Sequence, residues 1–222
     1  MAPMITTIAA VTAVILCTQQ DAPQLPPGMT PQMMEDLMKA ATPGEMHAWL
    51  AKDVGTWKGT FKNYPAPGAP PVEGPVSMTV KPMLDGRFME CNVSMPMPGM
   101  GEFHGMGTVG YDNAQGKFQA TWMDNMGTGI MYGTGELSAD RKTFTVTYNF
   151  YCPVRKCQST MREVLTRDSD NHQVMKMYGP DMVNGKEYLM MEASYDRVPA
   201  APAAKPAAPA KTAAPATKPA GR

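Results

Sequence analysis

Alternating apolar and polar residues dominate the chain from residue 56 to residue 197. In one such run, Phe144, Val146 and Tyr148 alternate with Thr and Asn residues. Turn-forming pairs such as Asp85-Gly86 separate the runs from one another. A period of two is typical of β-strands that bury one face, so the chain is predicted to be mostly β.

Counting these runs predicts about ten strands. They are expected near residues 56–64, 75–83, 86–95, 102–111, 116–123, 128–137, 142–151, 157–167, 172–178 and 186–197. No stretch after Gly55 has the pattern of a long helix, which a parallel crossover would need. A meander of this size must close or stack to protect its edges, which favours an antiparallel up-and-down barrel. A two-sheet sandwich is the alternative.

Residues 21–53 precede the predicted barrel and contain a Pro-rich segment followed by two short helical patterns. Thr30 is expected to cap the first helix, with Pro31 in its first turn. Thr42 begins the second pattern, which leads into Trp49. Helices as short as these are expected to pack on the barrel or to close one of its ends.

The first 20 residues contain no Asp, Glu, Lys or Arg, and residues 5–17 form an apolar run. Such a run is typical of a signal-peptide core and is too short to span a bilayer. Residues 1–20 are therefore predicted to be the signal peptide of a bacterial protein exported to the periplasm or cell envelope. An apolar N-terminal helix of a cytosolic protein is the alternative. A lipid anchor at Cys17 stays open, although Leu16 stands where such sites usually have a small residue.

Residues 199–222 consist almost entirely of Ala, Pro, Lys and Thr and are predicted to be a disordered tail. The tail carries four basic side chains and no acid, which leaves 16 basic and 20 acidic side chains in the rest of the chain. It is expected to act as a spacer, with weak contact to anionic envelope polymers as the alternative. Nucleic-acid binding lacks support, because the part of the chain predicted to fold is acidic.

Several segments carry a resemblance to a known family. They include WLAKDVGTWKGTF, LDGRF, GMGTVGYDN and the block from Trp122 to Gly129. From about Thr30 to Arg197 the chain resembles the bacterial family called domain of unknown function 1579 (DUF1579). That family is similar to the lipocalin superfamily, whose first strand often carries a Gly-x-Trp element, which here ends at Trp57. The resemblance implies a lipocalin-like β-barrel over residues 54–198, and it implies no established activity.

A small apolar molecule held in the barrel lumen is the first functional hypothesis, because closed barrels of about eight strands or more can enclose one. Phe118 and Trp122 share one face of a predicted strand, and Ile130 and Tyr132 share one face of the next. The candidate lumen residues are Trp57, Phe118, Trp122, Asp124, Ile130, Tyr132 and Arg162.

Two further features of these strands bear on the lumen. Glycines at positions that include 105, 107, 133 and 135 leave the strands without bulk, which allows either sharp coiling or room for a ligand. Arg162 and Glu163 are neighbours in a strand, so one of the two is expected to point inward. An inward Arg162 would need an acidic partner, for which Asp124 and Glu192 are the candidates.

A non-catalytic structural or interaction module of the cell envelope is the second hypothesis, and a copper-binding protein is a further alternative. The chain contains 23 Met, and thioethers are soft ligands suited to Cu(I). The candidate metal ligands are Met95, Met97, Met100, His104 and Met106. Methionines also occur at alternating strand positions elsewhere, which favours a role in filling the barrel interior. An open lumen with a polar group at its base would favour ligand binding, and a filled lumen would favour the envelope module.

Cys152 and Cys157 are separated by four residues at a predicted strand-to-strand turn. Facing ends of a hairpin lie within the distance that a disulfide requires, so the two are predicted to be bonded in an oxidising compartment. Cys91 is expected to be a buried free thiol. Phosphate loops, nucleophile elbows and zinc-protease motifs do not occur in the sequence, so an enzyme is the least favoured reading.

Overall fold

The structure is a computed structural model that describes residues 25–97, 99 and 101–199. The described residues up to Thr42 form one unit and those from Pro43 onward form another, and each is described by itself. The predicted signal peptide with Cys17, and the predicted tail beyond Pro199, lie outside the described residues. Within the described ranges, no helix is both long and apolar enough to cross a membrane.

The first unit contains helix α1 (Pro31–Ala41). Thr30 caps it as predicted, because its hydroxyl oxygen accepts a hydrogen bond of 3.2 Å from the backbone N–H of Met33. The hydroxyl of Thr42 donates a bond of 2.6 Å to the carbonyl oxygen of Met38. Thr42 therefore ends α1, and the prediction that it begins the next helix is wrong.

Helix α2 (Glu45–Ala51) opens the second unit, and its N-cap is Gly44. The backbone N–H of Gly44 donates to Nδ1 of His47 at 3.0 Å, so a side chain one turn into the helix satisfies the backbone at its start. His47, Trp49 and Leu50 are buried. The buried face of α2 is therefore the face that meets the barrel.

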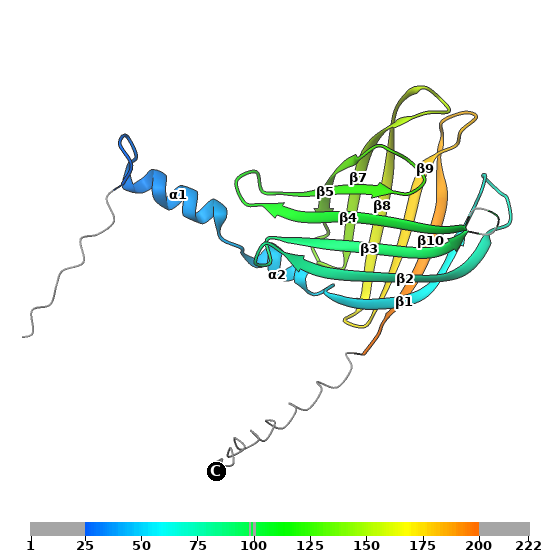
Figure 1. The fold of residues 1–222 in the computed structure, drawn as a ribbon, viewed down its shortest axis with the longest axis horizontal. Helices are drawn as coiled ribbons and strands as arrows, with labels where there is room; N and C mark the ends of the chain where they lie inside the picture. Colours follow the sequence, from blue (N-terminus) through cyan, green and yellow to red (C-terminus); the bar gives the residue numbers. More distant parts are fainter. Residues whose placement is uncertain (1–24, 98, 100, 200–222) are drawn as a thin grey trace, which may run out of the picture. The chain divides into compact units, whose positions relative to one another are not determined.

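Ten strands follow and form one closed barrel in which every neighbouring pair is antiparallel (Figure 1). They are β1 (Gly55–Asn63), β2 (Val72–Met83), β3 (Phe88–Met97), β4 (Gly101–Asp112), β5 (Lys117–Asp124), β6 (Met131–Leu137), β7 (Thr143–Cys152), β8 (Cys157–Ser169), β9 (His172–Pro180) and β10 (Glu187–Arg197). Each strand pairs with the next along the chain, and β1 pairs with β10 to close the ring. The predicted ten-stranded antiparallel barrel is confirmed, and the sandwich alternative is wrong.

The seam between β1 and β10 is held where Trp57 lies opposite Arg197 in the strand register. The indole of Trp57 is fully buried and donates to the carbonyl oxygen of Asp53 at 2.9 Å. The guanidinium of Arg197 lies 4.1 Å from the centre of the Trp57 ring and donates to the carbonyl oxygens of Lys52 and Val54. One residue pair thus ties the last strand to the first strand and to the segment after α2.

Candidate functional site

The interior of the barrel contains a cavity of about 530 Å³. Leu50 and Asp53, in and just after α2, line it at one end. Val72 and Met126 line it at the opposite end and are exposed, so the cavity opens to solvent there. A volume of this size lies within the range of small-molecule sites.

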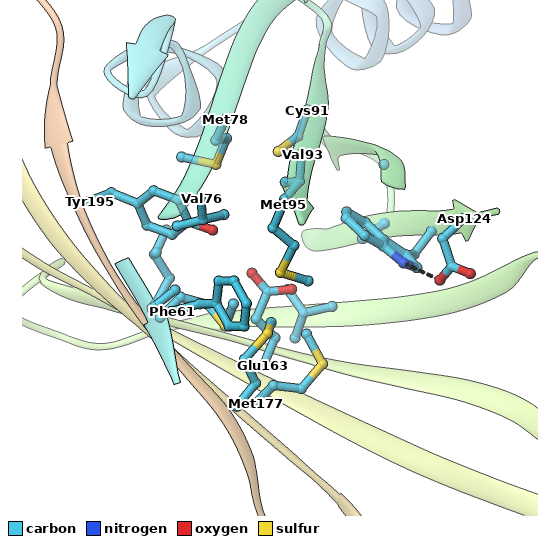
Figure 2. A pocket seen from close by; sticks show the side chains of 18 of the residues that line it. Phe61, Val76, Met78, Cys91, Val93, Met95, Asp124, Glu163, Met177 and Tyr195 are labelled. Atoms are coloured by element: carbon cyan, nitrogen blue, oxygen red, sulfur yellow. Dashed lines mark hydrogen bonds between the residues drawn. The ribbon is translucent and has the colours of Figure 1, made fainter. Parts of the chain in front are cut away.

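Apolar side chains from the inward faces of the strands form most of the wall. Eleven of the lining residues are methionine, which is close to half of the methionines in the chain. In Figure 2 the sulfur atoms of Met78, Met95 and Met177 lie around the cavity together with that of Cys91. The methionines thus follow the pattern expected of interior filling, yet they leave open space between them.

An aromatic cluster beside α2 builds the closed end. The ring of Trp49 lies 5.3 Å from that of Phe144 and 6.0 Å from that of Phe118, measured between ring centres. Its indole N–H donates to the carbonyl oxygen of Arg141 at 3.2 Å. These contacts fix α2 across this end of the barrel, as the sequence predicts for one of its short helices.

Glycines in β4 make room for a wall residue and not for a ligand. A β-carbon at Gly105 would overlap the ring of Trp122, which comes from the neighbouring strand β5. Phe103 stacks on the same ring at 6.4 Å between ring centres. At Gly133 and Gly135 the corresponding space is taken by Tyr148, Val146 and Phe144. Neighbouring side chains therefore take the space at these glycines, so they do not provide room for a ligand.

Asp53 is the polar group at the base of the cavity. Its Oδ1 accepts a hydrogen bond of 2.8 Å from Nη2 of Arg167, and the two side chains are only 14 % and 9 % exposed. The guanidinium of Arg167 also lies 4.3 Å from the centre of the Trp49 ring. Burial raises the pKa of Asp53 above its usual range, and the charge of Arg167 partly opposes this rise.

Asp124 lies at the other end of β5, toward the mouth. Its Oδ2 accepts a hydrogen bond of 2.9 Å from the indole N–H of Trp122, drawn as a dashed line in Figure 2. Its Oδ1 accepts one of 3.0 Å from the backbone N–H of Met126. Both oxygens are therefore engaged in holding the wall and the β5–β6 connection.

Glu163 is the inward member of the adjacent pair in β8, and it lies deep in the cavity. Figure 2 shows its carboxyl group between Phe61, Met95 and Met177. Among the described residues it has no hydrogen-bond or ion-pair partner. Loss of solvation raises the pKa of this carboxyl from 4.5 to about 7.

Three further polar groups border the cavity without hydrogen-bond partners among the described residues: the hydroxyls of Tyr148 and Tyr195 and the amide of Gln173. Gln173 is fully buried and lies opposite Tyr195 in the strand register. Loss of solvation, reinforced by the charge of Glu163, raises the pKa of both tyrosines and raises that of Cys91 to about 12. These groups are therefore neutral at physiological pH.

The structure brings only part of the predicted lumen set together. Trp122 and Asp124 line the cavity. Phe118 points inward but lies in the aromatic cluster at the closed end. Trp57 is buried at the seam and does not line the cavity.

Three predicted lumen residues lie on the outside, which corrects the assignment made from the sequence. Tyr132 is 63 % exposed, and Ile130 is also exposed. In β6 the inward positions are those of Met131, Gly133 and Gly135, so the shared face was the wrong one. Arg162 forms an outer ion pair of 2.7 Å with Glu187, and it needs no acid in the lumen.

Glu163 was recognised as one of two inward candidates, whereas Gln173, Tyr148 and Tyr195 were missed. The alternation in β7 places Tyr148 on the same face as Phe144 and Val146, and this signal was available in the sequence.

The candidate copper site is not assembled. Met95 and Met97 line the cavity, whereas His104 lies outside and contacts Glu102. Met106 also lies on the outer face, beside His104, and Met100 is outside the described residues. Successive positions of a strand point to opposite faces, so these residues cannot share one ion. In the described part of the chain, no group of three or more His, Cys, Asp or Glu is placed to hold a metal.

Cys152 and Cys157 lie opposite each other in the β7–β8 register, but both are free thiols in the structure. Sγ of Cys152 contacts Sδ of Met182 at 3.7 Å, and Sγ of Cys157 contacts the hydroxyl of Ser159 at 3.8 Å. The predicted opposition of the two positions is observed, and the predicted bond is not. Cys91 is a half-buried free thiol that lines the cavity.

The sequence model of the family DUF1579, described as a protein of unknown function, matches residues 42–197. The chain belongs to this family. The fold of this DUF1579 member is similar to the crystal structure of Rv2717c from M. tuberculosis, with a TM-score of 0.52 and 12 % identity. The similarity covers 71 % of this chain and 100 % of that one, and at this identity it shows the fold alone. No curated protein matches the chain.

Proposed function

We propose that this DUF1579 protein binds a small apolar molecule in the cavity of its barrel. The observation that carries the proposal is a cavity of about 530 Å³, lined mainly by methionine and other apolar side chains and open at one end. Burial of apolar ligand surface against such a wall supplies the binding free energy. The polar groups inside the wall then orient the ligand.

Export belongs to the same proposal. Its support is the apolar run at residues 5–17 within an uncharged segment of 20 residues. A ligand-binding protein in the periplasm or cell envelope would hold poorly soluble molecules in an aqueous compartment. Western analysis of periplasmic and cytoplasmic fractions from cells that express the full chain tests this part, with the protein expected in the periplasmic or envelope fraction.

Binding is tested with N-phenyl-1-naphthylamine, an uncharged probe whose fluorescence rises in apolar surroundings. The wild-type protein is expected to bind it saturably. Val93→Trp fills the cavity from β3 and is expected to weaken binding by about tenfold or more. Asn92→Trp is the matched control, because Asn92 lies outside the cavity on the same strand.

Two results would count against the proposal. One is the absence of saturable probe binding by the folded wild-type protein. The other is equal weakening by Val93→Trp and Asn92→Trp, which would place the probe outside the cavity. Either result would leave the structural or interaction module of the envelope as the better hypothesis.

A further inference from the structure

The only side chains lining the cavity in the described part of the chain that can carry a charge at neutral pH are carboxyl groups. Three carboxyl groups line it, those of Asp53, Asp124 and Glu163. No Lys, Arg or His is among its lining residues in the described part of the chain. At the closed end the basic group of Arg167 is paired with Asp53 and stacked on Trp49. The cavity therefore presents acceptors of hydrogen bonds and negative charge to whatever enters it.

Only one of the three carboxyl groups is without a partner. Asp53 is paired with Arg167 at 2.8 Å, and Asp124 accepts bonds from Trp122 and from the backbone of Met126. Glu163 has neither a hydrogen bond nor an ion pair among the described residues, although it lies among apolar side chains (Figure 2). An unpaired carboxylate in such surroundings is costly, so a cation brought to it would be bound strongly.

The surroundings of Glu163 add acceptors and aromatic rings. The phenol oxygens of Tyr148 and Tyr195 line the same cavity, and neither makes a hydrogen bond within the described structure. The amide of Gln173 is fully buried at the wall, and both of its polar atoms also lack a partner. The two phenol groups thus hold unused hydrogen-bonding capacity in the cavity that contains Glu163, and Gln173 adds an unpartnered amide enclosed in its wall.

We propose that the cavity takes a hydrophobic amine, whose protonated amino group pairs with Glu163 and whose apolar body lies among the methionines and aromatic rings. This inference rests on the proposed function and adds the chemical class of the ligand. An ammonium group has three N–H groups that can donate hydrogen bonds, and carboxylate and phenol oxygens can accept them. Aromatic ring faces and thioethers are further favourable neighbours for an organic cation.

The same arrangement disfavours an anionic ligand. A fatty acid would bring a second carboxylate to Glu163 and Asp124 with no basic residue in the cavity wall to neutralise it. A neutral alcohol would bind through its apolar body and one hydrogen bond. The cavity is therefore expected to rank ligands of equal length by the charge of their head group.

The first experiment displaces N-phenyl-1-naphthylamine from the full chain with decylamine, decanol and decanoate at about pH 8. Decylamine is expected to displace the probe at a concentration at least about tenfold lower than decanol, and decanoate is expected to be weakest. If decanoate matches or exceeds decylamine, the inference is overturned while the proposed function stands. If the wild-type protein does not bind the probe at all, the proposed function itself fails.

The second experiment assigns the effect to one residue. Glu163→Gln keeps the shape of the side chain and removes its charge, so it is expected to reduce decylamine affinity about tenfold or more and to change decanol affinity less than about twofold. Glu192→Gln is the matched control, because Glu192 is paired with Lys176 away from the cavity. An equal loss of decylamine affinity in the two variants, or no loss in either, overturns the role of Glu163.

The third experiment varies pH. Because Glu163 must be ionised to hold the cation, the affinity for decylamine is expected to rise between about pH 5.5 and pH 8, and that for decanol is not. The other titratable groups that face this space are Cys91, Tyr148 and Tyr195, which stay neutral in this range, Asp53, which is paired with Arg167, and Asp124, which accepts a hydrogen bond from Trp122. The comparison with Glu163→Gln separates the effect of Glu163 from that of the two aspartates. A rise that persists in Glu163→Gln would contradict the assignment.

Discussion

Arg167 and Asp53 are 114 positions apart in the sequence and form an ion pair of 2.8 Å at the closed end of the barrel. Their side chains are 9 % and 14 % exposed, and the guanidinium also lies over the ring of Trp49. The pair joins β8 to the segment between α2 and β1, so it links the segment that follows the closing helix to a strand three places from β1 in the ring.

Removal of Arg167 is expected to destabilise the protein strongly. Arg167→Met leaves Asp53 without its charge partner where burial already raises its pKa, at an expected cost of about 3 kcal/mol in the free energy of unfolding. Arg162→Met is the matched control, because it breaks the solvent-exposed pair with Glu187 and is expected to cost less than about 1 kcal/mol. Urea denaturation measures both, and equal losses would contradict the special role of the buried pair.

Glu163 is expected to make stability fall as pH rises. Its pKa is raised from 4.5 to about 7 in the native protein, so between these values the native state keeps a proton that the unfolded state has lost. The free energy of unfolding is therefore expected to decrease across this window by about 3 kcal/mol and then to change no further on account of this group.

The variant Glu163→Gln isolates that contribution. Its stability relative to wild type is expected to increase from about pH 4.5 to pH 7 and to stay higher at pH 8. Thermal or urea unfolding over this pH series measures the difference, with Glu192→Gln as the control. Parallel curves for wild type and Glu163→Gln would show that the carboxyl group is not held in a desolvated site.

A side chain at Gly105 is expected to destabilise the protein. In Gly105→Ala the added methyl group meets the ring of Trp122, so either the ring or β4 must shift, at an expected cost of about 1–3 kcal/mol. Gly127→Ala is expected to change stability by less than about 0.5 kcal/mol, because nothing lies within 4 Å of its added atom. If urea unfolding gives the two variants the same stability, the ring does not occupy the space that the structure assigns to it.

Cys152 and Cys157 are expected to form a disulfide when the protein matures under oxidising conditions, because the β7–β8 register places them opposite each other. Titration of thiols in the unreduced, unfolded protein should then detect Cys91 and miss this pair. In the folded protein Cys91 should react slowly with thiol reagents, because burial raises its pKa to about 12. Reaction of all three cysteines after unfolding would show that the pair is not bonded.

The strand order follows from local information in the sequence. Period-two runs separated by turn pairs such as Asp85-Gly86 predict about ten antiparallel strands, and the structure confirms them. A strand with one buried face has alternating apolar and polar residues, whichever strands it pairs with. A short turn brings the next strand directly alongside, so consecutive strands pair. The cap of α1 at Thr30 was predictable for the same local reason.

The end of α1 shows where local information is ambiguous. Thr42 has the side chain of an N-cap and is followed by Pro43, yet its hydroxyl bonds back to Met38. A Thr can satisfy a backbone group in either direction, and the sequence around it does not distinguish the two.

The sequence by itself determined that the chain is a ten-stranded antiparallel β protein and which residues share a face, whereas only the tertiary structure decided which face is inside. A period of two places Ile130 and Tyr132 on the same face but does not say whether that face points inward. Met131 lies on one face of β6 and Tyr132 on the other, and both are apolar enough to be buried. The same holds for Arg162 and Glu163, of which the structure turns the acid inward. Closure of β1 on β10 gives every strand an inner and an outer face at once. The cavity with its unpaired carboxyl group exists only after that closure.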